Sequence, residues 1–74
     1  MKYDYGDEVL FKGIDEGGEA VIKQCSVVGI TEVQSQRQAE MLASPIGAVF
    51  YTVEFGDGSD RLVSEDVLSP LPAN

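Results

Sequence analysis

The sequence feature that most constrains the fold is the alternation of apolar and polar residues over residues 48–55, followed by a glycine-rich turn. Such alternation places every second side chain on one face of a half-buried β-strand. The next residues are rich in glycine and aspartate, as hairpin turns are, and residues 60–64 can form the return strand. A three-residue loop at residues 57–59 sets Val53 opposite Val63 and keeps the apolar residues of both strands on one face. The side chains expected in the core of this hairpin are Tyr51, Val53, Phe55 and Val63.

Two earlier apolar segments also predict strands. Residues 9–11 form a short one between turn residues, and residues 20–31 form a long one. The alternation of the long strand is imperfect, because Ile22 and Cys25 fall on opposite phases. A β-bulge near Lys23 and the residue after it would restore one inward face.

The segment after the long strand has a different pattern, with apolar side chains at the spacing of one helical face. Ser35 and Gln38 fit a capping box, and Pro45 prevents the helix from continuing. We therefore expect a short helix over residues 35–43, inserted between the second and third strands, with Leu42 buried. Its apolar stripe is narrow, which indicates a helix that covers an open end of the sheet.

The remaining residues complete a mostly-β domain. Residues 64–67 predict one helical turn, Leu68 a brief last strand, and residues 71–74 an extended tail. The expected fold is a single small five-stranded barrel over residues 1–70, with the helix between strands two and three and the helical turn before the last strand. Closure into a barrel removes the exposed edges of a small open sheet.

Two stretches near the end of the chain resemble Tudor-type SH3-like barrels. They are Tyr-Thr-Val-Glu-Phe-Gly-Asp-Gly at residues 51–58 and Val-Ser-Glu-Asp-Val-Leu-Ser-Pro-Leu at residues 63–71, and residues 6–9 fit the opening of that family. The resemblance implies an SH3-like barrel and, as one possible role, a reader of a modified or proline-rich peptide. The chain has no tryptophan, and no tyrosine follows Phe55 in the turn, so the aromatic cage of that family is not carried over.

A second resemblance is to the small acidic immunity proteins of bacterial polymorphic toxin systems. It is carried by the Gly-Asp start, Val-Val-Gly-Ile at residues 27–30, Pro-Ile-Gly at residues 45–47 and the motif at residues 51–58. This resemblance implies a protein that binds and neutralises a cognate toxin.

The charge is strongly and unevenly negative. The chain carries 13 acidic and 5 basic residues, a net charge of −8. Residues 1–19 contain six acids and two bases, and residues 54–74 contain five acids and one base, so each end has a net charge of −4. Phosphate backbones would be repelled, which disfavours nucleic acid as a partner. A basic protein partner is therefore expected, the alternative being that the acids only keep the domain soluble.

Alternate loops of an up-and-down meander share one end of the sheet, so the 15–19 and 56–60 loops are expected side by side. Their carboxylates would form an acidic rim that steers a basic partner toward the domain. The candidate residues of this rim are Asp15, Glu16, Glu19, Asp57 and Asp60. Binding energy also concentrates on aromatic residues. The candidate aromatic anchors, where exposed, are Tyr3, Tyr5 and Phe50.

The sequence lacks the residues on which most enzymes and metal sites depend. It has no histidine, and Cys25 alone makes neither a zinc site nor a Cys–His nucleophile. Cys25 lies in an apolar segment and is expected to be a buried apolar side chain. Most acids lie beside glycine or another charge rather than in apolar surroundings that would raise a carboxyl pKa. We therefore expect no enzymatic activity, no cofactor and no metal.

The lone cysteine, the absence of an apolar signal sequence and the short apolar stretches predict a cytoplasmic protein that binds no membrane. A structural or adaptor subunit of a larger assembly stays open as a third role beside the acidic binding module and the peptide reader.

Overall fold

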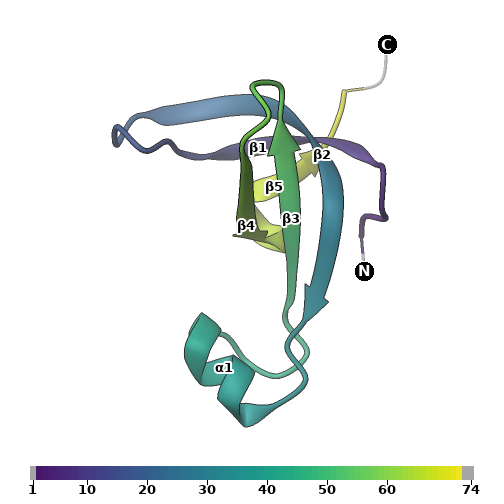
Figure 1. The fold of residues 1–74 in the computed structure, drawn as a ribbon, viewed down its shortest axis with the longest axis vertical. Helices are drawn as coiled ribbons and strands as arrows, with labels where there is room; N and C mark the ends of the chain where they lie inside the picture. The colour runs from purple at the N-terminus through teal and green to yellow at the C-terminus, as the bar shows by residue number, and fades with distance from the viewer. Residues whose placement is uncertain (1, 73–74) are drawn as a thin grey trace.

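The computed structural model describes residues 2–72 (Figure 1). In order, the elements are β1 (Glu8–Ile14), β2 (Ala20–Glu32), α1 (Gln36–Leu42), β3 (Val49–Phe55), β4 (Asp60–Ser64), the 3-10 helix η1 (Glu65–Val67) and β5 (Leu68–Pro70). The strands form one antiparallel sheet in the order β4-β3-β2-β1-β5. The mostly-β class, the helix between the second and third strands and the helical turn before the last strand are confirmed.

The β3–β4 hairpin forms as predicted, but its loop lies one residue earlier. The Phe55 N–H donates to the Ser59 carbonyl at 2.8 Å, so the three loop residues are 56–58 rather than 57–59. Tyr51 consequently pairs with Val63, and Val53 with Arg61. The third loop position requires a left-handed backbone, which Gly58 adopts at a φ of 86°. The glycine needed at this loop position therefore determines how β3 and β4 pair. In both strands the side chains that were predicted to face inward still do so.

The predicted β-bulge near Lys23 is wrong, because the β1–β2 ladder runs without interruption past that residue. The irregularity lies at Val28 instead, where the β2–β3 pairing shifts between Val27 and Gly29. No bulge is needed to bring Ile22 onto the same face as Cys25, because Ile22 lies on the outer face of the sheet and is 66% exposed. The inner face of this half of β2 carries Val21, Lys23, Cys25 and Val27.

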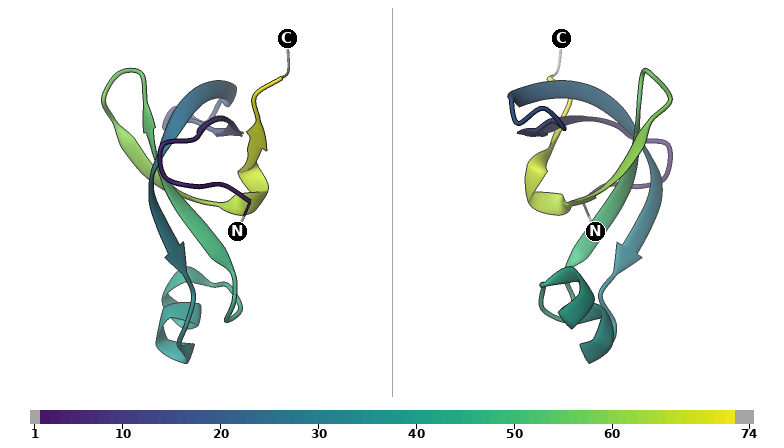
Figure 2. Two further views of the ribbon diagram at one scale, coloured as in Figure 1. Left: turned by 90° about the vertical axis from the view of Figure 1, so that its right-hand side faces the viewer. Right: turned by 60° about the vertical axis from the view of Figure 1, so that its left-hand side comes forward.

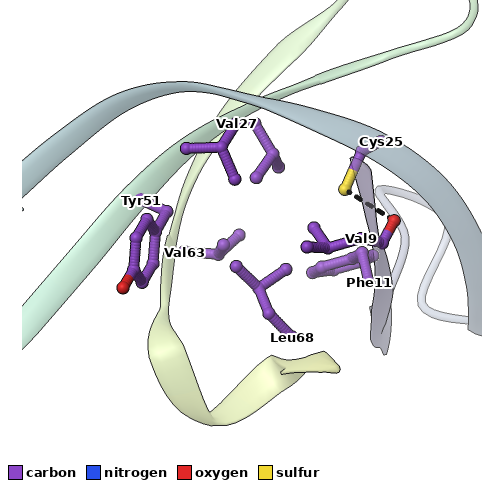
Figure 3. Packing of buried hydrophobic residues seen from close by; sticks show 8 residues of the cluster. Val9, Phe11, Cys25, Val27, Tyr51, Val63 and Leu68 are labelled. Carbon is purple, nitrogen blue, oxygen red and sulfur yellow. Dashed lines mark hydrogen bonds between the residues drawn. The ribbon is translucent and has the colours of Figure 1, made fainter. Parts of the chain in front are cut away.

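The core is a cluster of buried side chains on the concave side of the curled sheet (Figures 2 and 3). Its members are Val9, Phe11, Cys25, Val27, Tyr51, Val53, Val63 and Leu68. Three of the four predicted core residues of the hairpin are buried, whereas Phe55 is half-buried because it lies directly before the hairpin turn. Val63 of β4 and Leu68 of β5 meet in this cluster, although β4 and β5 are at opposite edges of the sheet.

Helix α1 forms where predicted, but it lies elsewhere in space. The Ser35 hydroxyl accepts a hydrogen bond from the Gln38 N–H at 3.2 Å, which confirms the N-cap. Figure 1 shows α1 at the tip of an arm made by β2 and β3, away from β1, β4 and β5, so it does not cover an end of the sheet. Leu42 is therefore half-buried rather than buried, and Ile46, which belongs to the same stripe, is 58% exposed. The two strands extend past the rest of the sheet and carry the helix with them.

Residues 71–72 follow β5 without regular structure, and the rest of the predicted tail, residues 73–74, lies outside the described residues. Among residues 2–72, no helix has the length and apolar character needed to cross a membrane.

Tyr51 joins the core to both ends of the chain. Its ring is fully buried, and its hydroxyl donates to Glu65 Oε2 at 2.7 Å and accepts from the Tyr3 N–H at 3.3 Å. The Lys2 N–H also donates to Glu65, at 3.3 Å. The hydrogen bond from Tyr51 lowers the pKa of Glu65, and burial together with that bond raises the pKa of Tyr51.

The Tyr51–Glu65 bond predicts a specific pH dependence. A carboxyl group whose pKa is lowered by folding adds stability above its ordinary pKa of about 4.3, and that stability is lost as the pH falls through the folded value. Glu65→Gln keeps an acceptor but cannot titrate. The free energy of unfolding from urea titrations should thus be higher for the wild type at pH 6, and the difference should shrink toward pH 3.

Asp66→Asn is the matched control, because Asp66 is an exposed acid in the same 3-10 helix. A difference between wild type and Glu65→Gln that stays constant with pH, or equals that of the control, would show that the carboxylate does not stabilise the fold through Tyr51.

Candidate functional site

A hollow of about 540 Å³ is lined by residues of the β1–β2 and β3–β4 hairpins. Figure 1 shows the turns of both hairpins toward the end of the molecule opposite α1. The two turns have the same design. The Asp15 N–H donates to the Glu19 carbonyl at 2.9 Å, just as Phe55 bonds Ser59, and Gly18 takes the left-handed position of Gly58. Two equal three-residue loops therefore flank one opening.

Four of the five predicted rim residues line this hollow. Glu16 lies in the first loop and Asp15 directly before it, whereas Asp57 lies in the second loop and Asp60 is the first residue of β4. Glu19 is exposed but is not among the lining residues. The two loops thus bring together carboxylates that are more than forty positions apart in the sequence.

Two phenylalanine rings form the apolar part of the hollow. Phe11 is buried and Phe55 half-buried, and their rings meet edge-to-face with centroids 5.5 Å apart. This geometry is favoured because the positive edge of one ring meets the negative face of the other. The packing of the core therefore continues up to the surface between the two turns.

Two basic side chains also line the hollow, and we did not predict them as site residues. The Arg61 guanidinium lies over the Phe11 ring at 5.3 Å from its centroid, and its Nη1 donates to the Ile14 carbonyl at 2.8 Å. The Lys23 ammonium lies over the Phe55 ring at 5.6 Å. Arg61 thereby ties β4 to the end of β1 across the opening. The sequence contained the information needed to predict them, because the alternation of each strand places Lys23 and Arg61 on the inward face of the sheet.

The electrostatics of the hollow remain negative. Four acids and two bases line it, which gives −4 plus 2, a net charge of −2. The Ser59 hydroxyl and N–H both donate to Asp57 Oδ1, at 2.6 Å and 2.9 Å, and these bonds lower the pKa of Asp57. Asp15 Oδ1 accepts from the Glu19 N–H at 2.9 Å. Two of the rim carboxylates are thus held in place by their own turns.

The three predicted aromatic anchors do not join the hollow. Tyr3 is half-buried, packs edge-on against Tyr51 at 5.5 Å and donates to the Leu68 carbonyl at 3.3 Å. Tyr5 is 64% exposed before β1, and Phe50 is half-buried on the outer face of β3 opposite Ser64. Tyr3 therefore contributes to the packing of the fold. Of the three predicted anchors, only Tyr5 exposes most of its side chain to solvent.

Cys25 is a core residue, as predicted. It is 3% exposed, its Sγ lies 3.7 Å from the Val9 carbonyl oxygen (Figure 3), and burial raises its thiol pKa. Within the part of the chain that the structure describes, no group of three or more acidic, cysteine or histidine side chains is placed to hold a metal ion.

No protein-family model, curated protein or solved structure matches this chain. The chemistry of the hollow is accordingly the basis on which its function is proposed below.

Arg61 should stabilise the hollow measurably. Replacing it in Arg61→Gln removes the cation–π contact with Phe11 and the charged donor to Ile14, so we expect a loss of about 1 kcal/mol in the free energy of unfolding. Urea titration gives this value. Arg37→Gln is the control, since Arg37 is exposed on α1, and should change stability by less than about 0.5 kcal/mol. Equal effects of the two variants would contradict a role for Arg61 in holding the hairpins together.

Proposed function

We propose that this chain is a non-enzymatic protein-interaction module that docks a basic protein on the acidic rim of the hollow. The observation that carries the proposal is the meeting of four carboxylates, from two hairpin turns, around one opening. A folded acidic rim of this kind raises the local concentration of a cationic partner and speeds its encounter.

The proposed architecture is an SH3-like barrel. It is supported by the strand order, in which β5 lies beside β1, by the 3-10 helix between β4 and β5, and by Val63 and Leu68 sharing one core. Many unrelated binding functions use this architecture, so the role depends on the site and not on the fold.

The floor of the hollow gives the rim a defined shape. Arg61 and Lys23 are held over phenyl rings, so the rim carboxylates surround fixed positive charges instead of a uniform acidic surface. A docking partner therefore needs basic groups placed toward the two turns and acidic or neutral groups placed toward the centre. Such an arrangement favours one orientation over others, because a misplaced cation would meet Arg61 or Lys23.

A cationic toxin fits this kind of partner, as the resemblance to immunity proteins implies. The rim carboxylates would then occupy the place of the phosphates that a cationic nuclease binds. A peptide reader has less support, because the ring faces of Phe11 and Phe55 carry the chain's own cations. A reader needs rings that are free to receive a ligand.

The test is the association of a lysine- and arginine-rich peptide, followed by stopped-flow fluorescence at low and high salt. In one variant Asp15, Glu16, Asp57 and Asp60 become the corresponding amides, which keep the turn hydrogen bonds. In the matched control Glu8, Glu32, Glu54 and Asp66, all exposed and outside the hollow, become amides. Both variants change the net charge by the same amount.

We expect the rim variant to associate roughly ten-fold more slowly than wild type at low salt, and the control to be affected much less. The wild-type rate should fall steeply as salt rises, since charges are screened beyond about 8 Å at physiological ionic strength. Equal slowing of both variants would mean that only net charge matters, and indifference to salt would show that the acids serve solubility alone.

A further inference from the structure

Residues 33–48, here called the insertion, project from the sheet as a separate tip. All views show α1 at one end of the molecule, beyond the ends of β2 and β3 (Figures 1 and 2). The base of the insertion is fastened, because the Val33 N–H donates to the Ala48 carbonyl and the Gly47 N–H donates to the Val33 carbonyl, both at 2.8 Å. Val33 itself is buried. The tip is therefore a defined part of the fold.

The insertion exposes apolar side chains that the sheet does not cover. Met41 is 75% exposed and Ile46 is 58% exposed, and Leu42 is only half-buried. They lie on a helix of two turns and on the loop that follows it. Of these side chains, Met41 lies four residues after Arg37 on α1, so the two share one exposed face of the helix.

The charge of the insertion differs from that of the rest of the chain. Its charged residues are Arg37 and Glu40, so its net charge is zero. The other 12 acids and 4 bases lie outside it and carry the whole net charge of −8. Two copies of this chain repel each other over most of their surfaces, because those surfaces are negatively charged. The insertion has no net charge, so two copies can meet there without this electrostatic repulsion.

We propose that the insertion docks against the insertion of a second copy of this chain, with the two α1 helices antiparallel. Arg37 and Glu40 are both exposed and lie three residues apart, on one face of the helix. In a two-fold contact, residue i of one copy meets residue j of the other and the reverse. Arg37 of each copy therefore faces Glu40 of its partner, beside the exposed Met41 side chains.

The shape of the molecule favours association through the two insertions. The chain is 39 Å along its longest axis, and α1 lies at one end of that axis. A tip-to-tip contact keeps the two acidic bodies apart by more than the screening length of about 8 Å at physiological salt. The acidic hollows then point away from the contact, so each stays open for the proposed basic partner.

The contact is small, so the pair should be weak. A two-turn helix and its loop bury less than the roughly 1,200 Å² of a standard interface, and such small interfaces belong to weak, transient complexes. We expect a dissociation constant on the order of 0.1–1 mM, measured by sedimentation equilibrium over a concentration series. Association should weaken only slightly as salt rises, because the acidic bodies already lie farther apart than the screening length and the Arg37–Glu40 pairs are in direct contact, whereas basic-peptide binding at the hollow should weaken steeply.

The decisive test uses charge exchange. Arg37→Glu places two acids on the helix face, and Glu40→Arg places two bases there, so each variant alone should associate at least ten-fold more weakly than wild type. An equimolar mixture of the two should regain association, because each helix then faces its complement. The doubly exchanged chain, Arg37→Glu with Glu40→Arg, should associate as wild type does.

Circular dichroism on each variant checks that α1 is retained. Regained association in the mixture cannot come from helix stability, since each chain in it carries its single substitution. A wild type that stays monomeric up to about 5 mM, above the whole expected range of the dissociation constant, would overturn the proposal. So would single variants that associate as wild type does, or a mixture that does not. The proposed binding at the hollow stands or falls separately, because the peptide assay detects it at monomer concentrations.

Discussion

The fold depends on the burial of Tyr51 and on the two hydrogen bonds of its hydroxyl. The ring is fully buried in a core that a chain of this size can barely supply, and the hydroxyl reaches Glu65 of η1 and the backbone of Tyr3. Since η1 joins β4 to β5, this one side chain couples β3 to the segment that connects the two edge strands of the sheet. An unpartnered buried phenol would cost stability that a small domain lacks.

The candidate site follows from how the sheet ends. Both hairpins close with a three-residue loop whose last residue is a glycine in the left-handed region, so the loops have the same reach and flank one hollow. Polar turns supply the carboxylates, while the strands beneath supply Phe11 and Phe55. Arg61 joins the two parts, because it stacks on Phe11 and bonds the backbone at Ile14. The contacts that Arg61 makes with the edge of the core thus also hold the acidic rim in place.

Local patterns predicted the elements, and long-range packing decided where they lie. The alternation at residues 48–55 predicted β3 and its partner, and Ser35 marked the start of α1, because strand phase and capping depend on neighbouring residues. The bulge at Val28 depends on how β2 pairs with β3, which local alternation does not determine. The one-residue shift of the β3–β4 loop follows from the left-handed glycine that the third loop position requires, because alternation alone fits both loops. Placing α1 over the sheet failed because the lengths of β2 and β3 carry it beyond the core. The loops that share the hollow were anticipated from meander topology, whereas Lys23 and Arg61 were not predicted as site residues although strand alternation places both on the inward face.

The central claim is that the hollow between the two hairpins receives a basic partner, and amide chemical-shift mapping tests it most directly. A lysine- and arginine-rich peptide titrated into the ¹⁵N-labelled protein should shift the amides of residues 13–19 and 55–61 in proportion to occupancy. The amides of the insertion should stay unchanged at protein concentrations where the chain is monomeric. Shifts spread evenly over all acidic segments, or confined to residues 33–48, would contradict the assignment of the hollow as the docking site.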